Sequence, residues 1–242
     1  MPMNFSVRVP GISLYRGMLF LAAAFLCVLG TCVLFAQPSS SLPEEIEWTW
    51  EVRPLHPDPK LPNVLLLGDS ITRNYFPEVK KDLAGVANVY LMASSTSVGD
   101  PRLPRQIVEF STMMHVPFQV VHFNNGMHGW RYTEAQYKAA FPGFLRSVRR
   151  LVMSPAALVW ATTTPVRSDA ANGATNDRVD GRNAIAAPIV QAAKIAVDDQ
   201  HALMLRHGDL HQDSIHFNPA GANLQGDQAA ETIKAAIART HN

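Results

Sequence analysis

Two polar segments far apart in the chain carry side chains that together could perform nucleophilic chemistry. One is Gly68-Asp69-Ser70, directly after an apolar run, and the other is HQDSIHFNPAG, in which Asp213 stands three residues before His216. A serine hydroxyl becomes a nucleophile when a base takes its proton, and an imidazole base needs an acid that orients it. Ser70, His216 and Asp213 are therefore a candidate nucleophile, base and orienting acid.

Each segment also has an ordinary interpretation. Gly-Asp-Ser is a common turn, and a serine at a helix N-terminus can equally hold a phosphate, because backbone N–H groups and the helix dipole favour an anion there. An isolated Asp-x-x-His is more often a solvent-exposed loop. A phosphate or nucleotide binder would need a glycine-rich stretch and a lysine, which residues 68–70 lack, so this class ranks last.

Four apolar runs have the length of strands and are apolar on both faces, as buried parallel strands require. They cover residues 63–67, 89–93, 118–123 and 157–161. Helix signals lie between them, so the sequence predicts a doubly wound α/β sheet in a single domain. In such a sheet ligands bind beyond the carboxyl ends of the strands, and Ser70 follows the end of the first run.

The helix signals are specific at three places. Thr133 and Gln136 form a capping-box pattern before an apolar stripe, and Pro142 is expected to bend or restart that helix. An apolar stripe over residues 185–196 predicts a second helix. The dipeptide Asn218-Pro219 predicts the start of a third, because asparagine is a good cap and proline suits the first helical position.

Together the two polar segments and the α/β pattern resemble the SGNH hydrolase family, also called GDSL esterases and lipases, over about residues 62–238. The resemblance implies a three-layer α/β/α sandwich, flavodoxin-like, with a mainly parallel sheet. It implies a triad of Ser70, His216 and Asp213 that hydrolyses an ester or thioester. It also implies that neither a metal nor an organic cofactor takes part.

The second sequence block of that family normally supplies a glycine after the second strand, whose N–H binds the oxyanion together with the N–H of the nucleophile. Here the block reads LMASSTSVGDPR. Gly99 is the nearest glycine, and Ser95 or Ser97 could occupy the same place. The resemblance therefore implies an oxyanion hole built in part by the backbone of Ser70 and of Gly99.

The third block is normally Gly-x-Asn-Asp, and here the stretch is HFNNGMHGW. Alignment on Gly126 puts His128 where the asparagine belongs and Gly129 where the aspartate belongs, whereas alignment by residue type selects Asn125. An imidazole N–H or an amide could each donate to the oxyanion, a contribution worth about 3 kcal/mol. Three neighbours of these blocks are candidates for substrate contact: Asp69, Asn124 and Trp130.

Composition narrows the class of partner. The chain has 242 residues, of which 47% are hydrophobic, which suffices for one domain with a full core. Its 21 basic and 20 acidic side chains give a formal charge of +1 with no long run of either sign, which excludes an electrostatic surface for nucleic acid. His207, His211 and His216 lack the helical spacing of a zinc site, so no metal is expected.

The first residues predict export. Residues 18–36 carry no charge and follow Arg8 and Arg16, so 1–36 is predicted to be a signal peptide or a signal anchor, with cleavage left open. Residues 37–61 are predicted to be a tether followed by a Trp/Pro-rich arm, and 62–242 the hydrolase-like domain. Both cysteines, Cys27 and Cys32, belong to the leader. The leader also holds two of the 21 basic residues, so the rest of the chain has 19 basic and 20 acidic residues and a formal charge of −1.

The sequence thus predicts an extracytoplasmic serine esterase, periplasmic or secreted, that touches a membrane only through its N-terminal segment. Short acyl esters such as acetyl groups on carbohydrate are the expected substrate, a small molecule or a glycan. The alternative is a catalytically inactive protein on the same fold that binds a glycan or another ligand. The oligomeric state is left open.

Overall fold

The structure is a computed structural model that describes residues 1–3, 40–154, 157–167 and 173–240. The predicted leader, apart from its first three residues, lies outside this part of the chain, and so do Cys27 and Cys32. Residues Pro38–Asn242 form one compact unit. Within the described residues no helix combines the length and apolar character needed to cross a membrane.

A six-stranded sheet forms the centre of this unit, in the order β1-β3-β2-β4-β5-β6. The strands are β1 (Thr49–Val52), β2 (Asn63–Gly68), β3 (Asn88–Ser94), β4 (Val120–Phe123), β5 (Leu158–Ala161) and β6 (Ala196–Asp198). β1 pairs antiparallel with β3, and all other pairs are parallel. Without β1 the order is that of a flavodoxin-like sheet, whose topological switch lies beside β2, the strand that precedes Ser70.

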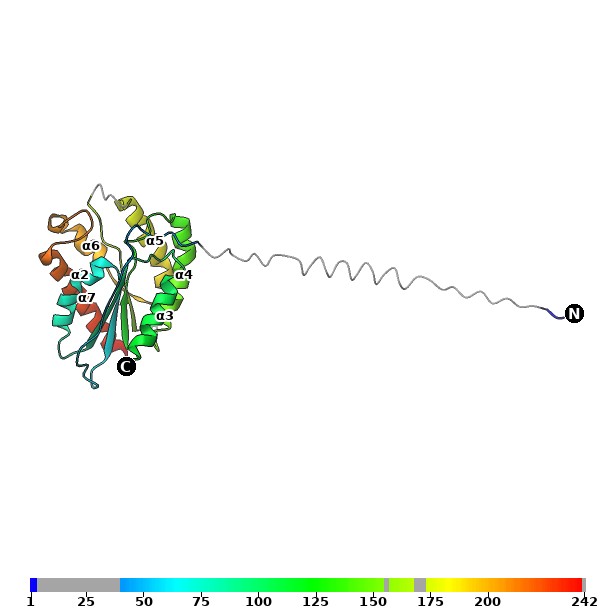
Figure 1. Cartoon of the computed structure of the whole chain (residues 1–242), viewed down its shortest axis with the longest axis horizontal. Helices are drawn as coiled ribbons and strands as arrows, with labels where there is room; N and C mark the ends of the chain where they lie inside the picture. Colours follow the sequence, from blue (N-terminus) through cyan, green and yellow to red (C-terminus); the bar gives the residue numbers. More distant parts are fainter. Residues whose placement is uncertain (4–39, 155–156, 168–172, 241–242) are drawn as a thin grey trace. The chain divides into compact units, whose positions relative to one another are not determined.

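Helices cover both faces of the sheet (Figure 1). One face carries α2 (Ser70–Asp82) and α7 (Pro219–Thr240), and the other carries α3 (Leu103–Met114), α4 (Glu134–Arg149) and α5 (Asn176–Ala192). Side chains of β2 alternate between two cores, so that Val64 and Leu66 lie in the first and Leu65 and Leu67 in the second. The predicted three-layer α/β/α architecture is confirmed.

Polar caps begin the helices where the sequence predicts them. Thr133 and Gln136 form a complete capping box at α4. Asn218 accepts a hydrogen bond from the N–H of Gly221 through its side chain, and α7 begins at the next residue, Pro219. A short helix α6 (Gln200–Leu205) and a 3-10 helix η2 (Gly208–Leu210) lie between β6 and α7. These caps fix the ends of the segments that carry the candidate site.

One helix prediction is wrong at its end, and a second is wrong in part, because α4 does not restart at Pro142. α4 runs without interruption through Pro142. The helix predicted over residues 185–196 ends at Ala192, because Lys194 turns the backbone with a positive φ of 56° and Ala196 then begins β6. The apolar stripe therefore joins the last turns of a helix to the first residue of a strand.

The segment predicted as a tether differs from its prediction. We call residues 40–52 the arm. Residues 40–47, predicted as part of a tether, are hydrogen-bonded to the domain, and Thr49–Val52 form the edge strand β1, which the composition did not indicate. Because β1 is exposed along most of its length, it lacks the alternation of buried and exposed residues that reveals a strand.

Candidate active site

Ser70, His216 and Asp213 come together at the carboxyl edge of the sheet. The Oγ atom of Ser70 lies 2.8 Å from Nε2 of His216, and Nδ1 of the same ring lies 2.9 Å from Oδ2 of Asp213. Ser70 is the first residue of α2, directly after β2, whereas the other two residues lie in the loop between η2 and α7. The loop carries its imidazole and carboxylate across to α2 because α7 packs against α2.

The loop is shaped so that Asp213 can reach the imidazole. Oδ1 of Asp213 accepts hydrogen bonds from the backbone N–H groups of Ile215 and His216, at 2.8 and 2.7 Å, which leaves Oδ2 for the ring. The N–H of Gln212 donates to the carbonyl of His216 at 2.8 Å and closes the turn. A spacing of three residues therefore suffices to place acid and base side by side.

The same contacts set the ionisation of Asp213. Although partial burial acts to raise it, the hydrogen bonds from the backbone of His216 and Ile215 and from the imidazole lower the pKa of Asp213 to about 2. A carboxyl titration followed by NMR should give about 2 in the wild type and a higher pKa in His216→Ala. Because the folded pKa is depressed, the stabilisation by this carboxylate is full above the ordinary pKa of 3.8 and is lost as the pH falls from there through about 2. A wild-type titration near the ordinary aspartate pKa of 3.8 would contradict these hydrogen bonds.

Asp69 connects the nucleophile turn to the neighbouring loop. Its Oδ1 caps α2 by accepting from the N–H of Ile71 at 3.0 Å, and its Oδ2 accepts from the N–H of Met127 at 3.3 Å. A Cβ at Gly68 would overlap the side chain of Thr72, so only glycine allows α2 to start this close to the strand. Asp69 is buried and its polar contacts lie within the protein, which makes it a support of the turn.

The loop after β4 is held by Asn124, a predicted candidate for substrate contact, and by Arg182, which the sequence did not single out. Asn124 donates to the carbonyl of Ala161 and accepts from the N–H of Gly126, so its amide is occupied within the protein. From α5, the guanidinium of Arg182 donates to three backbone carbonyls of the loop: Gly126, His128 and Gly129. Arg182 is 1% exposed and lies 3.8 Å from the ring centre of Trp130.

Both side chains considered for the oxyanion carry buried polar atoms with no hydrogen-bond partner in the described part of the chain. For Asn125 these are both amide atoms, and for His128 the atom is Nε2. Buried polar groups are rarely left without a partner, and such groups recur at catalytic sites. The structure therefore keeps both residues as candidates.

The three residues of the loop after β3 that were considered for the oxyanion hole have different contacts. The N–H of Ser95 donates to the carbonyl of Trp48 and its hydroxyl contacts Glu47, so the arm occupies its donors. Ser97 has a buried hydroxyl without a partner among the described residues, and its side chain lies against Gly129. Gly99 packs on the ring of Tyr132, where a Cβ would come within 2.7 Å of the ring, so packing explains this glycine whether or not its N–H has a role.

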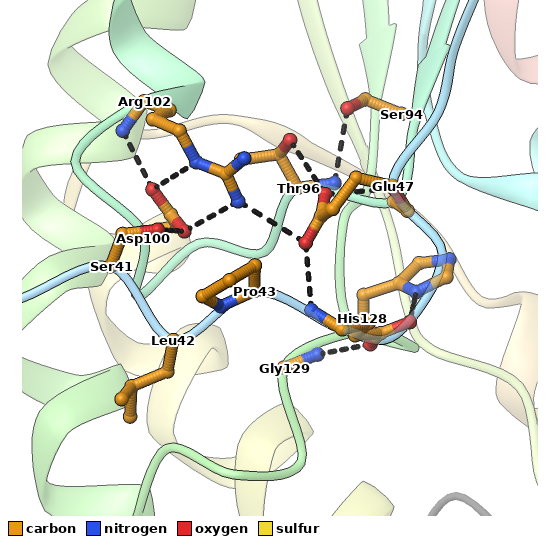
Figure 2. A network of polar contacts seen from close by, with 12 residues as sticks. Ser41, Leu42, Pro43, Glu47, Ser94, Thr96, Asp100, Arg102, His128 and Gly129 are labelled. Carbon is orange, nitrogen blue, oxygen red and sulfur yellow. Dashed lines mark hydrogen bonds and ion pairs between the residues drawn. The ribbon is translucent and has the colours of Figure 1, made fainter.

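The arm brings three residues to this region that sequence reasoning missed. Glu44 contacts Nδ1 of His128 and the N–H of Gly129, each at 3.0 Å. Glu47 forms an ion pair with Arg102 at 3.1 Å. Trp48 packs edge-on against the ring of His128, with ring centres 5.8 Å apart. Figure 2 shows the arm crossing the loop that carries His128 and Gly129, and no local pattern in the sequence indicates these contacts.

Two further predictions can be placed. Trp130 is buried beneath the guanidinium of Arg182, and with Trp48 it lines a surface pocket of 510 Å³ beside the arm. His211 bonds to the carbonyls of Gly208 and Pro165, away from the partners of His216. His211 and His216 therefore share no hydrogen-bond partner among these contacts.

Comparison with known proteins identifies the fold. No protein-family model and no curated protein matches the sequence. A member of the lipolytic G-D-S-L family from Veillonella parvula superposes with a TM-score of 0.58 at 17% identity, covering 71% of this chain and 98% of its own. A carbohydrate esterase family 3 protein from Talaromyces cellulolyticus gives 0.58 at 16% identity, covering 74% and 99%.

An acetylxylan esterase from Geobacillus stearothermophilus gives a TM-score of 0.56 at 15% identity, covering 71% of this chain and 94% of its own. The chain thus has the SGNH hydrolase fold, as its two end motifs predicted.

Proposed function

We propose that the protein is a serine hydrolase of carboxylic esters. In this proposal Ser70 is the nucleophile, His216 the general base and Asp213 the group that orients the base. The observation that carries it is the continuous set of contacts from the hydroxyl to the imidazole to the carboxylate, at 2.8 and 2.9 Å. The esterases among the similar folds support the same chemistry.

The contacts are suited to the two half-reactions of acyl transfer. Oγ of Ser70 bonds to the acyl carbon as its proton passes to Nε2 of His216, and the carbonyl oxygen becomes an oxyanion. The proton then passes to the leaving alcohol, the carbon–oxygen bond breaks, and the acyl group remains on Ser70. Water next gives a proton to His216 and attacks the acyl carbon, which releases the carboxylic acid and restores the serine hydroxyl.

The oxyanion needs hydrogen-bond donors that are already in place. The N–H of Ser70 points from the N-terminus of the 13-residue helix α2, where the helix dipole favours negative charge. The loop after β3 would supply a second donor, from Gly99 or Ser97. The loop after β4 would supply a third, from Asn125 or His128.

The exposure of the triad is suited to a large alcohol in the ester substrate. The side chains of His216 and Asp213 are 29% and 50% exposed, so a glycan can approach the triad from solvent. We propose acetyl esters of carbohydrate as the substrate class, because acetylxylan esterases are among the similar folds. The proposed location outside the cytoplasm rests on the apolar leader.

A fluorophosphonate probe tests the nucleophile. The wild type should be labelled covalently, and Ser70→Ala should not, because the probe reacts only with an activated serine hydroxyl. Ser147→Ala is the control, since this serine bonds within α4 and should leave labelling unchanged. Equal labelling of the wild type and Ser70→Ala would refute the proposal.

A hydrolysis screen tests the acyl group. Acetate release from acetylated xylan should exceed turnover of long-chain aryl esters, and Ser70→Ala should release none. A clear preference for long acyl chains would reject the proposed substrate class. Saturable glycan binding without any turnover would instead reject the enzyme.

A further inference from the structure

Glu44 of the arm holds the loop after β4 with both oxygens of its carboxylate. Oε2 lies 3.0 Å from Nδ1 of His128, and Oε1 accepts from the N–H of Gly129 at 3.0 Å. The N–H of Glu44 donates in turn to Glu47 at 2.8 Å, and Glu47 pairs with Arg102 (Figure 2). The arm therefore holds the backbone of Glu44, from which the carboxylate reaches the imidazole.

His128 is held from several sides. Its side chain is 12% exposed, the ring of Trp48 packs against it, and its Nε2 atom is buried without a partner among the described residues. Nε2 lies on the opposite side of the ring from Nδ1 and so points away from Glu44. The preceding residue, Met127, is hydrogen-bonded to Asp69, the residue directly before Ser70.

We propose that Glu44 is a positioning residue of the active site, which orients His128 so that its Nε2 donates to the oxyanion formed at Ser70. This inference rests on the proposed function, because the oxyanion exists only if Ser70 attacks a carbonyl. It selects His128 over Asn125 as the donor from the loop after β4. It also makes the arm a part of the active site.

The contact with Glu44 decides which protonation state of His128 can act. Because Nδ1 donates to the carboxylate, a neutral ring would present the lone pair of Nε2 to the oxyanion and repel it. Nε2 donates only when both ring nitrogens carry a proton. A charged donor of this kind forms a stronger hydrogen bond than a neutral one.

The surroundings favour that charged state. Glu44 and Glu47 face the ring from the arm and Asp69 from the start of α2, while Arg182 of α5 binds the carbonyl of His128. Although burial acts to lower it, the hydrogen bond to Glu44 and the charges of Asp69 and Glu47 raise the pKa of His128. The imidazolium is therefore present below this raised pKa and is lost as the pH rises through it.

Steady-state kinetics of Glu44→Gln test the proposal on an aryl acetate. We expect kcat to fall about 10- to 100-fold, as for loss of a group that orients a reacting one, with KM changed less than about twofold. Glu45→Gln is the matched control, because Glu45 is the exposed neighbour on the same arm. A wild-type kcat in Glu44→Gln, while Ser70→Ala is inactive, would refute this inference and leave the proposed function intact.

A second variant replaces His128 by a donor that does not depend on protonation, and it makes the test more specific. His128→Asn replaces the imidazolium by an amide donor, so adding Glu44→Gln to it should cost less than about twofold in kcat. In the wild type kcat should fall on the alkaline side as His128 loses its proton. This fall should be absent in His128→Asn, and in Glu44→Gln it should move to lower pH or disappear. Full, multiplicative losses in the double variant would overturn the proposal.

A titration independent of activity separates the two proposals. The ring nitrogens of His128, followed by NMR in the full chain, should titrate at a lower pH in Glu44→Gln than in the wild type, while Glu45→Gln titrates as the wild type does. An unchanged titration in Glu44→Gln would refute the pairing with Glu44 even if the protein turned over no ester. Absence of turnover with the expected titration would refute the proposed function instead.

Discussion

Alanine in place of Ser70 or His216 should lower kcat for ester hydrolysis by about 10⁴- to 10⁶-fold, and alanine at both positions should lower it no further. The Oγ and Nε2 atoms share one hydrogen bond of 2.8 Å, so either loss removes the activated nucleophile completely. Asp213→Asn should cost less, about 10⁴-fold, because the hydroxyl and the imidazole remain while the tautomer of the ring is no longer fixed.

The measurement is a double-mutant cycle on a soluble aryl acetate, with unfolding midpoints recorded for each variant. His56→Ala is the matched control, because His56 is exposed and lies outside the site. Losses that multiply in the double variant would mean that Ser70 and His216 act in separate steps. That result would contradict the triad.

A second large effect is expected on stability. Arg182→Met should lower the free energy of unfolding by about 3 to 5 kcal/mol. Its guanidinium donates to the carbonyls of Gly126, His128 and Gly129 at 3.1, 2.7 and 2.8 Å while the side chain is 1% exposed. Methionine keeps much of the volume but leaves these carbonyls without their donor. Because one of them belongs to His128, kcat should fall as well.

Urea unfolding of the full chain measures this loss, with Arg149→Met as control, because Arg149 is an exposed arginine near the end of α4. Arg182→Lys should rescue little, since one ammonium cannot reproduce the planar fork of donors that reaches several carbonyls. A loss below about 1 kcal/mol in Arg182→Met would show that the loop keeps its shape without the guanidinium.

The sequence predicted the parts of the molecule that depend on local pattern. The four buried strands appeared as apolar runs, and their carboxyl ends located Ser70. The spacing of Asp213 and His216 was readable because a turn of three residues joins the acid to the base. These features depend on residues close in the chain or on burial repeated along a segment.

Long-range contacts left no such pattern. Glu44 and His128 are 84 residues apart and meet only because the arm docks on the loops after β3 and β4. In the sequence Arg182 is one polar residue of the α5 segment, and nothing nearby indicates that it binds the loop after β4. Pro142 was expected to bend or restart α4, yet burial of Phe141 and Phe144 on either side keeps the helix continuous, despite a cost of about 3 kcal/mol for an interior proline.

The packing of α7 on α2 has a consequence for biosynthesis. Ser70 and His216 are 146 residues apart, and at about 5 to 20 residues per second a ribosome needs about 7 to 30 seconds to pass from one to the other. During that interval the serine has no base, and α2 has no partner helix. On the proposed mechanism a nascent chain cannot cleave esters, and recovery of turnover during refolding would report that α7 has packed against α2.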